Sequence, residues 1–197
     1  MKSYIYDPPR NNATDYYYFK DAFNQEELDT IVNKVSHIPF QQANTHSGDT
    51  DTRKSKIKWI PQTEEWEWLY EKLMMLAGMA NDEMWKFDIT SAPESIQYTE
   101  YHGDINGEYS WHQDIGPEEL STRKISITVQ LSDNSEYEGG DLMFWMGGKS
   151  LEDNNMVAPK GKGTVIIFPS YIYHSVLPVT KGVRKSFVLW LGGGHYK

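Results

Sequence analysis

Four residues of this 197-residue chain have types and spacings that could support metal chemistry: His112, Asp114, His174 and Arg184. His112 and Asp114 are two positions apart, so on an extended strand both side chains project to one face and could bind the same ion. His174 follows the apolar segment TVIIF and Pro169, which places a third ligand just past the end of another strand. Two imidazoles and one carboxylate form a facial triad, which leaves coordination positions open and favours Fe(II) chemistry over a structural metal.

The first pair also has a simpler explanation. A His-x-Asp pair arises easily by chance, and the two histidines could be partly buried residues while Asp114 ends a strand. His102 and Asp104 have the same spacing, but their segment, YHGDINGEY, indicates a turn rather than a strand that could aim two ligands together. We therefore favour His112 and Asp114 as the metal-binding pair.

Composition narrows the chemistry further. The chain has no cysteine, which excludes disulfides, thiolate catalysis and cysteine-based zinc sites. Its formal net charge of -9 argues against non-specific binding to nucleic acid or to a membrane surface. The segment MKSYIYDPPR lacks an apolar leader and no stretch is apolar enough to span a membrane, so we expect a cytoplasmic protein. The sequence indicates no particular oligomeric state.

Arg184 opens the segment RKSFVLWL, in which residues 184, 186, 188 and 190 share one face of a predicted strand. An arginine that points into a barrel needs an anion. Its planar guanidinium can hold a carboxylate through two hydrogen bonds, and the hydroxyl of Ser186 can add another. An exposed arginine on an edge strand is equally consistent with these residues taken alone.

Two amphipathic helices should precede the strands. Asn24 and Glu27 form a capping-box pattern, and apolar residues at i, i+3, i+4 and i+7 predict a helix over residues 24–36. A second helix is expected from about residue 63 to 80, with one apolar stripe made of Trp66, Leu69, Leu73, Met74 and Ala77. The polar segment 41–58 between them is expected to form a mobile loop beside the active site.

From about residue 95 the pattern changes to short β-rich segments separated by Gly, Pro and Asn: SIQYTEY, EYSWHQD, KISITVQL, DLMFWM, GTVIIF and RKSFVLWL. Six such strands predict a sandwich, jelly roll or barrel. We therefore expect a mainly β protein with flanking α-helices. A single domain over residues 1–197 should combine helical support over about 20–85 with a β core over about 86–192.

Several linked segments resemble one known family. YSWHQD, KISITVQLSD, YEGGDLMFW and GTVIIFPSYIYHSVLPVTKGVRKSFVLWL are similar, in this order, to segments of the Fe(II)/2-oxoglutarate-dependent dioxygenases, particularly their prolyl 4-hydroxylase-like (PKHD-type) branch. The resemblance covers about residues 53–191 and implies a double-stranded β-helix core, that is, a cupin-like jelly roll. It also implies iron ligands at His112, Asp114 and His174, and places the distal carboxylate of 2-oxoglutarate on Arg184.

The resemblance assigns further residues around the co-substrate. Tyr101 matches a tyrosine that helps to hold 2-oxoglutarate, with Tyr98 as the alternative because this stretch is longer than in many relatives. Gln130 stands where some relatives have a second tyrosine, and Leu142 matches an apolar residue of the pocket. We expect Ser186 to contact the co-substrate as well.

The function that the resemblance implies is hydroxylation with Fe(II), 2-oxoglutarate and O2, releasing succinate and CO2, with ascorbate as an optional reductant. Trp190 matches an aromatic residue on the substrate side. The resemblance and the polar segment with Arg53 and Ser55, followed by Trp59, indicate an extended peptide or protein substrate, with a prolyl residue as the leading candidate. Barrel packing for Trp190 and a solvated basic loop for Arg53 are the alternatives. A small-molecule hydroxylase of free amino acids or metabolites, and a non-catalytic jelly-roll binding module, are the competing functions.

Overall fold

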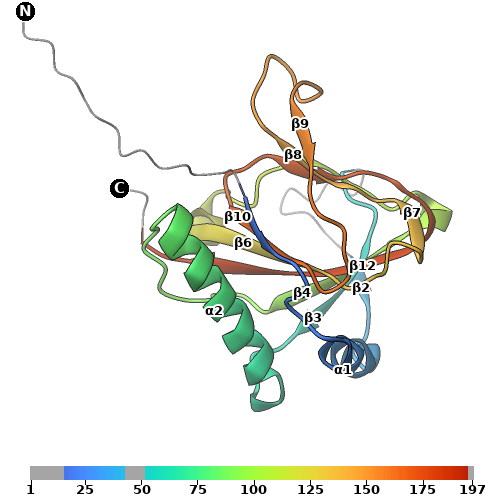
Figure 1. The fold of residues 1–197 in the computed structure, drawn as a ribbon, viewed down its shortest axis with the longest axis horizontal. Coiled ribbons are helices and arrows are strands. Elements are labelled where there is room, and N and C mark those ends of the chain that lie inside the picture. Colours follow the sequence, from blue (N-terminus) through green and yellow to red (C-terminus); the bar gives the residue numbers. More distant parts are fainter. Residues whose placement is uncertain (1–15, 43–51, 195–197) are drawn as a thin grey trace, which may run out of the picture.

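The computed structural model describes residues 16–42 and 52–194, and in these residues it shows a mainly β fold with two α-helices (Figure 1). The helices are α1 (Gln25–Ser36) and α2 (Glu67–Met84), and the short 3-10 helices are η1 (Glu64–Trp66), η2 (Gly103–Ile105) and η3 (Glu118–Thr122). The strands are β1 (Tyr17–Phe19), β2 (Gln41–Gln42), β3 (Lys56–Ile60), β4 (Ile96–His102), β5 (Tyr109–His112), β6 (Arg123–Gln130), β7 (Tyr137–Gly139), β8 (Leu142–Trp145), β9 (Asn155–Val157), β10 (Val165–Pro169), β11 (His174–Val176) and β12 (Val179–Gly192).

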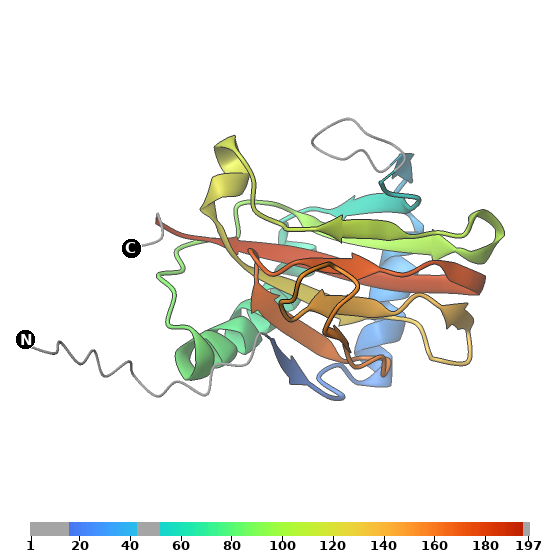
Figure 2. The ribbon, with the colours of Figure 1, turned by 90° about the horizontal axis from the view of Figure 1, so that it is seen from above.

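The strands form two antiparallel sheets. The large sheet has the order β1-β10-β6-β12-β4-β3-β2, with β7 also paired to β12, and the small sheet has the order β5-β11-β8-β9. Both helices lie on one side of the large sheet, and β8 and β9 lie on the other (Figure 1). From above, the long strand β12 runs between β4 and β6 (Figure 2). The fold is the expected double-stranded β-helix, or jelly roll.

Helix α1 begins where its capping box predicts. The side chain of Asn24 accepts a hydrogen bond from the backbone N–H of Glu27 (2.9 Å), and the Glu27 carboxylate accepts one from the Asn24 N–H (2.8 Å). These two bonds satisfy backbone donors that a helix start leaves without partners. Leu28, Ile31 and Val35 are buried on the predicted face, so the prediction for this helix is confirmed.

Helix α2 departs from its prediction in two ways. It continues past Ala80 to Met84, where the side chain of Asn81 bonds both the N–H and the C=O of Phe87 and so turns the chain away. Met74 was predicted to be buried, but 42% of it is exposed. The buried stripe passes instead from Leu73 to Leu76 and Ala77, because a helix rotates each residue by about 100° from the last.

Two apolar layers cover the two faces of the large sheet. On strand β6, Ile125, Ile127 and Val129 belong to the layer that packs against the helices. The second layer, between the sheets, includes Phe144 of β8 and Phe168 of β10. Along β10, Val165 and Ile167 belong to the first layer and Ile166 and Phe168 to the second, as the period of a strand requires.

The expected division into a helical part and a β part differs from the structure. Strands β2 and β3 come from the segment expected to provide helical support, and β1 lies just before that segment; the three strands extend the large sheet at both ends. Strands β2 and β3 also occupy the ends of the predicted loop 41–58, while residues 43–51 of that loop lie outside the described residues. Within the described ranges, no helix is long and apolar enough to cross a membrane.

Candidate metal centre

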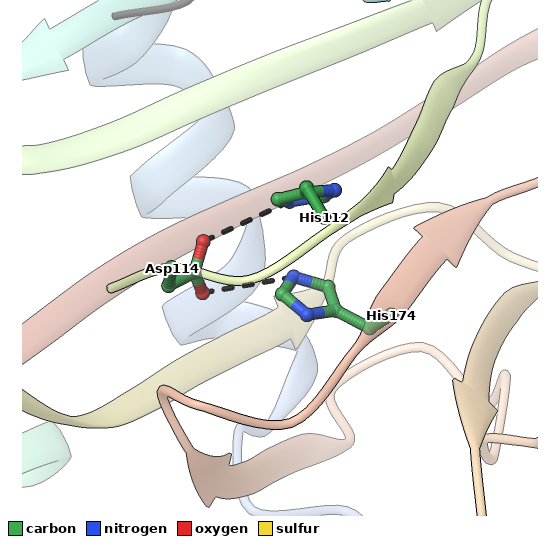
Figure 3. Close-up of side chains that lie close together, drawn as sticks. All are labelled: His112, Asp114 and His174. Atoms are coloured by element: carbon green, nitrogen blue, oxygen red, sulfur yellow. Dashed lines mark ion pairs between the residues drawn. The ribbon is translucent and has the colours of Figure 1, made fainter. Parts of the chain in front are cut away.

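The structure brings His112, Asp114 and His174 together between the two sheets (Figure 3). One ligand atom from each residue lies within 4.8 Å of the other two. The Nε2 atoms of His112 and His174 lie 3.7 Å and 3.6 Å from the two oxygens of the Asp114 carboxylate. Among the described residues this is the one group of three such side chains that could hold a metal ion.

The three residues reach this position from separate elements. His112 is the last residue of β5 and lies opposite His174, the first residue of β11. Asp114 was expected on the same strand as His112, but it lies two residues beyond the strand end. Its backbone N–H donates to the C=O of Ser170 (2.9 Å), just after β10, so the large sheet holds the carboxylate in place.

Backbone carbonyls orient both imidazoles. Nδ1 of His112 lies 2.7 Å from the Ser110 oxygen, and Nδ1 of His174 lies 2.9 Å from the Ile172 oxygen. Because a carbonyl oxygen only accepts hydrogen bonds, Nδ1 must carry the proton, and Nε2 of each neutral ring keeps its lone pair for a ligand. This is the usual arrangement of histidines that bind metals.

The charge state of the group also suits a divalent cation. Burial and the neighbouring His174 hold the pKa of His112 below its ordinary value, which keeps the ring neutral at neutral pH. Burial alone would raise the pKa of Asp114, but the neighbouring His174 and His112 outweigh it, together with a hydrogen bond from the hydroxyl of Ser126 (2.6 Å). The pKa of Asp114 therefore lies below its ordinary value. Two neutral nitrogens and one carboxylate fit a borderline divalent metal such as Fe(II).

Arg184 lies inside the molecule rather than at an exposed edge. Strand β12 begins five residues earlier than predicted, at Val179, and only 2% of Arg184 is exposed. Its Nη2 donates to Oε1 of Gln130 (2.9 Å), and its Nη1 donates to the hydroxyl of Ser186 (3.3 Å). Both acceptors are uncharged, and no carboxylate of the described residues pairs with this guanidinium. A buried cation without a counter-ion is costly, so the site fits an anionic ligand.

One cavity of about 640 Å³ connects the metal centre with Arg184. This volume lies within the range of small-molecule sites. The other predicted residues that line it are Arg53, Tyr101, Leu142, Ser186 and Trp190. Gln130 is buried against Arg184, whereas Tyr98 belongs to the apolar layer on the helix side and donates its hydroxyl to Glu100 (2.8 Å). Of the two candidate tyrosines, Tyr101 is thus the one at the cavity.

Known proteins share this sequence pattern. The sequence profile of the 2OG-Fe(II) oxygenase superfamily matches residues 96–192. A PKHD-type hydroxylase of Synechococcus sp. strain CC9902 is 36% identical over 90 residues, and one of Rippkaea orientalis is 24% identical over 178 residues. Over residues 96–192, just under half of its length, the chain resembles the 2OG-Fe(II) oxygenase superfamily. The first match spans 45% of this chain and 37% of the relative, and the second spans 87% and 75%.

Solved structures share the fold of this chain. A prolyl hydroxylase from Trichoplax adhaerens, in complex with a hypoxia inducible factor oxygen degradation domain peptide fragment, superposes with a TM-score of 0.73 at 17% identity. The match covers 91% of this chain and 84% of that one. The α-ketoglutarate-dependent epimerase SnoN from nogalamycin biosynthesis has a TM-score of 0.68 at 10% identity, covering 91% and 78%. The same fold therefore occurs in a hydroxylase and in an epimerase, and it does not by itself determine the reaction.

Sequence reasoning missed Ser126. Its hydroxyl donates to Asp114 and lies 3.0 Å from the hydroxyl of Ser170. A signal was present, because Ser126, Thr128 and Gln130 alternate with apolar residues along β6. In a strand buried on both faces, a run of alternate polar residues indicates that one face borders a site.

Arg123 was also missed. Its Nε and Nη2 donate to the two oxygens of Glu94 (2.6 and 2.5 Å), and its Nη1 donates to the backbone oxygen of Asp114 (3.1 Å). The guanidinium lies 3.8 Å from the ring centroid of Trp190. These partners are far apart along the chain, so no local pattern could have identified them.

Arg53 and Tyr109 form the wall of the cavity beside His112. The ring of Tyr109 stacks on the imidazole of His112, with 3.6 Å between the centroids and 18° between the planes. Burial raises the pKa of Tyr109 to about 12, so its hydroxyl stays protonated at neutral pH. The contact of Arg53 with a substrate stays a prediction, since its guanidinium is already engaged by side chains of the protein.

The rejected pair, His102 and Asp104, does not form a site. His102 is the last residue of β4, and its Nε2 lies 2.9 Å from the Glu100 carboxylate. Asp104 lies in η2, which confirms the turn predicted for this segment.

Proposed function

We propose that this chain is an Fe(II)- and 2-oxoglutarate-dependent dioxygenase that hydroxylates an unactivated C–H bond and releases succinate and CO2. The observation that carries the proposal is the content of one cavity. It holds a His-Asp-His donor set together with a buried arginine that has no carboxylate partner among the described residues. The metal site alone would not indicate the co-substrate. A dicarboxylate suits both the metal site and the buried arginine, because it carries a carboxylate for each.

In this proposal His112, Asp114 and His174 hold Fe(II) and leave the remaining positions open. When bound, the iron supplies the oxidising chemistry, in which O2 and 2-oxoglutarate are consumed together. The protein contributes binding, orientation and a neutral pair of imidazoles.

The co-substrate is held by residues of the large sheet. Arg184 binds the distal carboxylate of 2-oxoglutarate through its planar guanidinium, and Ser186 adds a hydroxyl donor. Gln130 orients the guanidinium by accepting one of its N–H groups. Tyr101 offers a hydroxyl at the cavity wall, and Leu142 provides an apolar surface for the methylene carbons.

The substrate that we propose is a prolyl residue in a peptide or protein. Support comes from the cavity lining, which includes Trp59, Trp111 and Trp190, since aromatic faces suit a saturated ring. The names of the PKHD-type relatives and the peptide-bound prolyl hydroxylase of the same fold point in the same direction.

The test is succinate formation from 2-oxoglutarate with Fe(II) and ascorbate, with proline-containing peptides assayed beside free amino acids. We expect peptides to stimulate turnover. Turnover in His174→Ala should fall further than the roughly 10- to 100-fold loss that follows removal of a residue that merely orients a metal ligand. His102→Ala removes a histidine outside the cavity and should retain activity. Full turnover in His174→Ala would contradict the iron site, and stimulation by free amino acids alone would favour the small-molecule hydroxylase.

A further inference from the structure

The segment of residues 52–55 joins the two sheets beside the metal centre. Strand β5, which ends at His112, is an edge strand of the small sheet. Three backbone hydrogen bonds join this segment to β5 and to the residue before it: the N–H of Ser110 donates to Thr52 (2.9 Å), that of Lys54 to Glu108 (2.9 Å) and that of Glu108 to Lys54 (3.2 Å). At the next residue, Lys56, the chain enters β3 of the large sheet. The strand that carries His112 is therefore tied to the large sheet through this segment.

The side chain of Arg53 reaches from this segment to the large sheet. Its Nε donates to the hydroxyl of Ser55 (2.8 Å), and its Nη2 donates to Gln97 (2.7 Å) and Thr99 (3.3 Å) of β4. All three acceptors are uncharged oxygens. The planar guanidinium is thus fixed in orientation while its positive charge is not neutralised by these contacts.

Tyr109 lies between Arg53 and the metal centre. The guanidinium carbon is 4.7 Å from the centroid of the Tyr109 ring, and the same ring stacks on His112 at 3.6 Å. A cation is attracted to the face of an aromatic ring, so the charge of Arg53 favours one position of Tyr109. The Tyr109 ring therefore contacts both the guanidinium of Arg53 and the imidazole of His112.

His112 needs such support more than His174 does. Its side chain is 17% exposed, against 7% for His174. The ring of His174 lies near two phenylalanines, Phe168 (4.8 Å) and Phe144 (6.3 Å), which are almost fully buried. His112 sits at the end of an edge strand, next to an irregularity in the β5–β11 register.

We propose that Arg53 is a positioning residue for the metal centre, which holds Tyr109 against His112 and so fixes the imidazole before the metal binds. The inference rests on the proposed function, because it requires a metal at His112. A ligand that is already oriented loses little freedom on binding, and this raises metal affinity. A residue that only contacted the substrate would change the KM for the substrate and leave metal affinity unchanged.

The experiment titrates Mn(II) into the metal-free full chain and follows free Mn(II) by electron paramagnetic resonance. Arg53→Met keeps an unbranched apolar stem in place of the aliphatic part of arginine and removes the charge and the donors. We expect the Kd for Mn(II) to rise about three- to tenfold, less than the roughly 10- to 100-fold seen for residues that bond a ligand directly. Lys54→Ala is the matched control, because it breaks only a partly exposed ion pair with Glu108 (2.6 Å) in the same segment.

Substitutions at Tyr109 test whether Arg53 acts on His112 through the Tyr109 ring. Tyr109→Phe keeps the stacked ring and should bind Mn(II) like the wild type, whereas Tyr109→Leu should lose as much affinity as Arg53→Met. If Arg53 acts through Tyr109, the double variant is no weaker than Tyr109→Leu alone, which is the non-additivity expected of residues in one chain of contacts. Thermal unfolding of each variant checks that it is folded.

Equal Mn(II) affinity in Arg53→Met and wild type would overturn the proposal, and a raised KM alone would assign Arg53 to the substrate instead. Additive losses in the double variant would overturn the route through Tyr109. A wild-type chain that bound no Mn(II), or a His174→Ala variant that bound it as tightly, would overturn the proposed iron site itself. The two failures are therefore distinguishable.

Discussion

Arg184 places a positive charge between two sheets, where its partners in the structure are the neutral oxygens of Gln130 and Ser186. At the scale of single residues this choice of partners decides the class of ligand. A carboxylate in place of Gln130 would neutralise the guanidinium, whereas an amide oxygen orients it and leaves its charge for a ligand. The departure from tyrosine at this position is therefore compatible with an anion site.

The variant Gln130→Glu tests whether the neutral amide leaves the charge of Arg184 available for a ligand, and it hardly changes the size of the side chain. Its carboxylate should pair with Arg184 and displace the co-substrate. A hydrogen bond to a charged group contributes about 1.5–3 kcal/mol, so the Kd for 2-oxoglutarate should rise at least about tenfold. Isothermal titration of 2-oxoglutarate into the Mn(II)-loaded protein measures it. Gln25→Glu, which adds the same charge at the exposed start of α1, should change nothing, and unchanged affinity in Gln130→Glu would argue against the anchor.

At the scale of elements, β12 carries the co-substrate site. It pairs with β7 at its start and with β4 and β6 over the rest of its length. The change of partner occurs near Gly182, which has a left-handed backbone (φ 72°), and a Cβ there would lie 2.0 Å from the backbone oxygen of Glu136. Only glycine fits this position, two residues before Arg184 turns into the cavity.

Two glycine substitutions should therefore have opposite effects on stability. Gly182→Ala forces a side chain into a left-handed position and against backbone, and we expect it to lower the free energy of unfolding by about 2–4 kcal/mol. Gly78→Ala lies on the exposed face of α2 with no atom within 4 Å of the new Cβ. It should raise the free energy of unfolding by about 0.5–1 kcal/mol. Urea unfolding measures both, and a stable Gly182→Ala protein would contradict the argument.

At the scale of the whole molecule, the metal centre joins the two sheets. Both histidines belong to the small sheet, whereas Asp114 is held by Ser126 of the large sheet and by Ser170, the residue after β10 of that sheet. The charge states of these groups depend on the packing of one sheet on the other. Stability and proton binding are therefore linked.

This linkage predicts acid sensitivity in the metal-free protein. The pKa of His112 lies below its ordinary value in the folded state, so the unfolded chain binds more protons as the pH falls below about 6.5, the ordinary histidine value. Stability should fall from there by up to about 1.4 kcal/mol per pH unit, and Asp114, whose pKa is also lowered, should extend the loss below about pH 4.

Urea unfolding over a series of pH values measures this slope, and His112→Gln is the matched variant. Its slope between about pH 6.5 and 4.5 should be smaller than that of the wild type, because the titrating imidazole is gone while the other histidines remain. Equal slopes in the variant and the wild type would show that His112 titrates alike in the folded and unfolded states.

The sequence by itself determined features that depend on near neighbours in the chain. The capping box of α1, the change to β-rich segments after residue 95 and the alternating faces of β6 and β12 follow from local periodicity, and the fold class with them. It also singled out the three residues that the structure brings within 4.8 Å.

Only the tertiary structure decided the features that depend on partners distant in the chain. It placed Tyr101 rather than Tyr98 at the cavity, buried Arg184, and moved Asp114 off its strand onto Ser170. It also revealed the contacts of Arg53, Tyr109 and His112, which no pattern indicated. The physical reason is that periodicity states which face a side chain occupies, whereas what lies opposite that face is set by the packing of one sheet against the other.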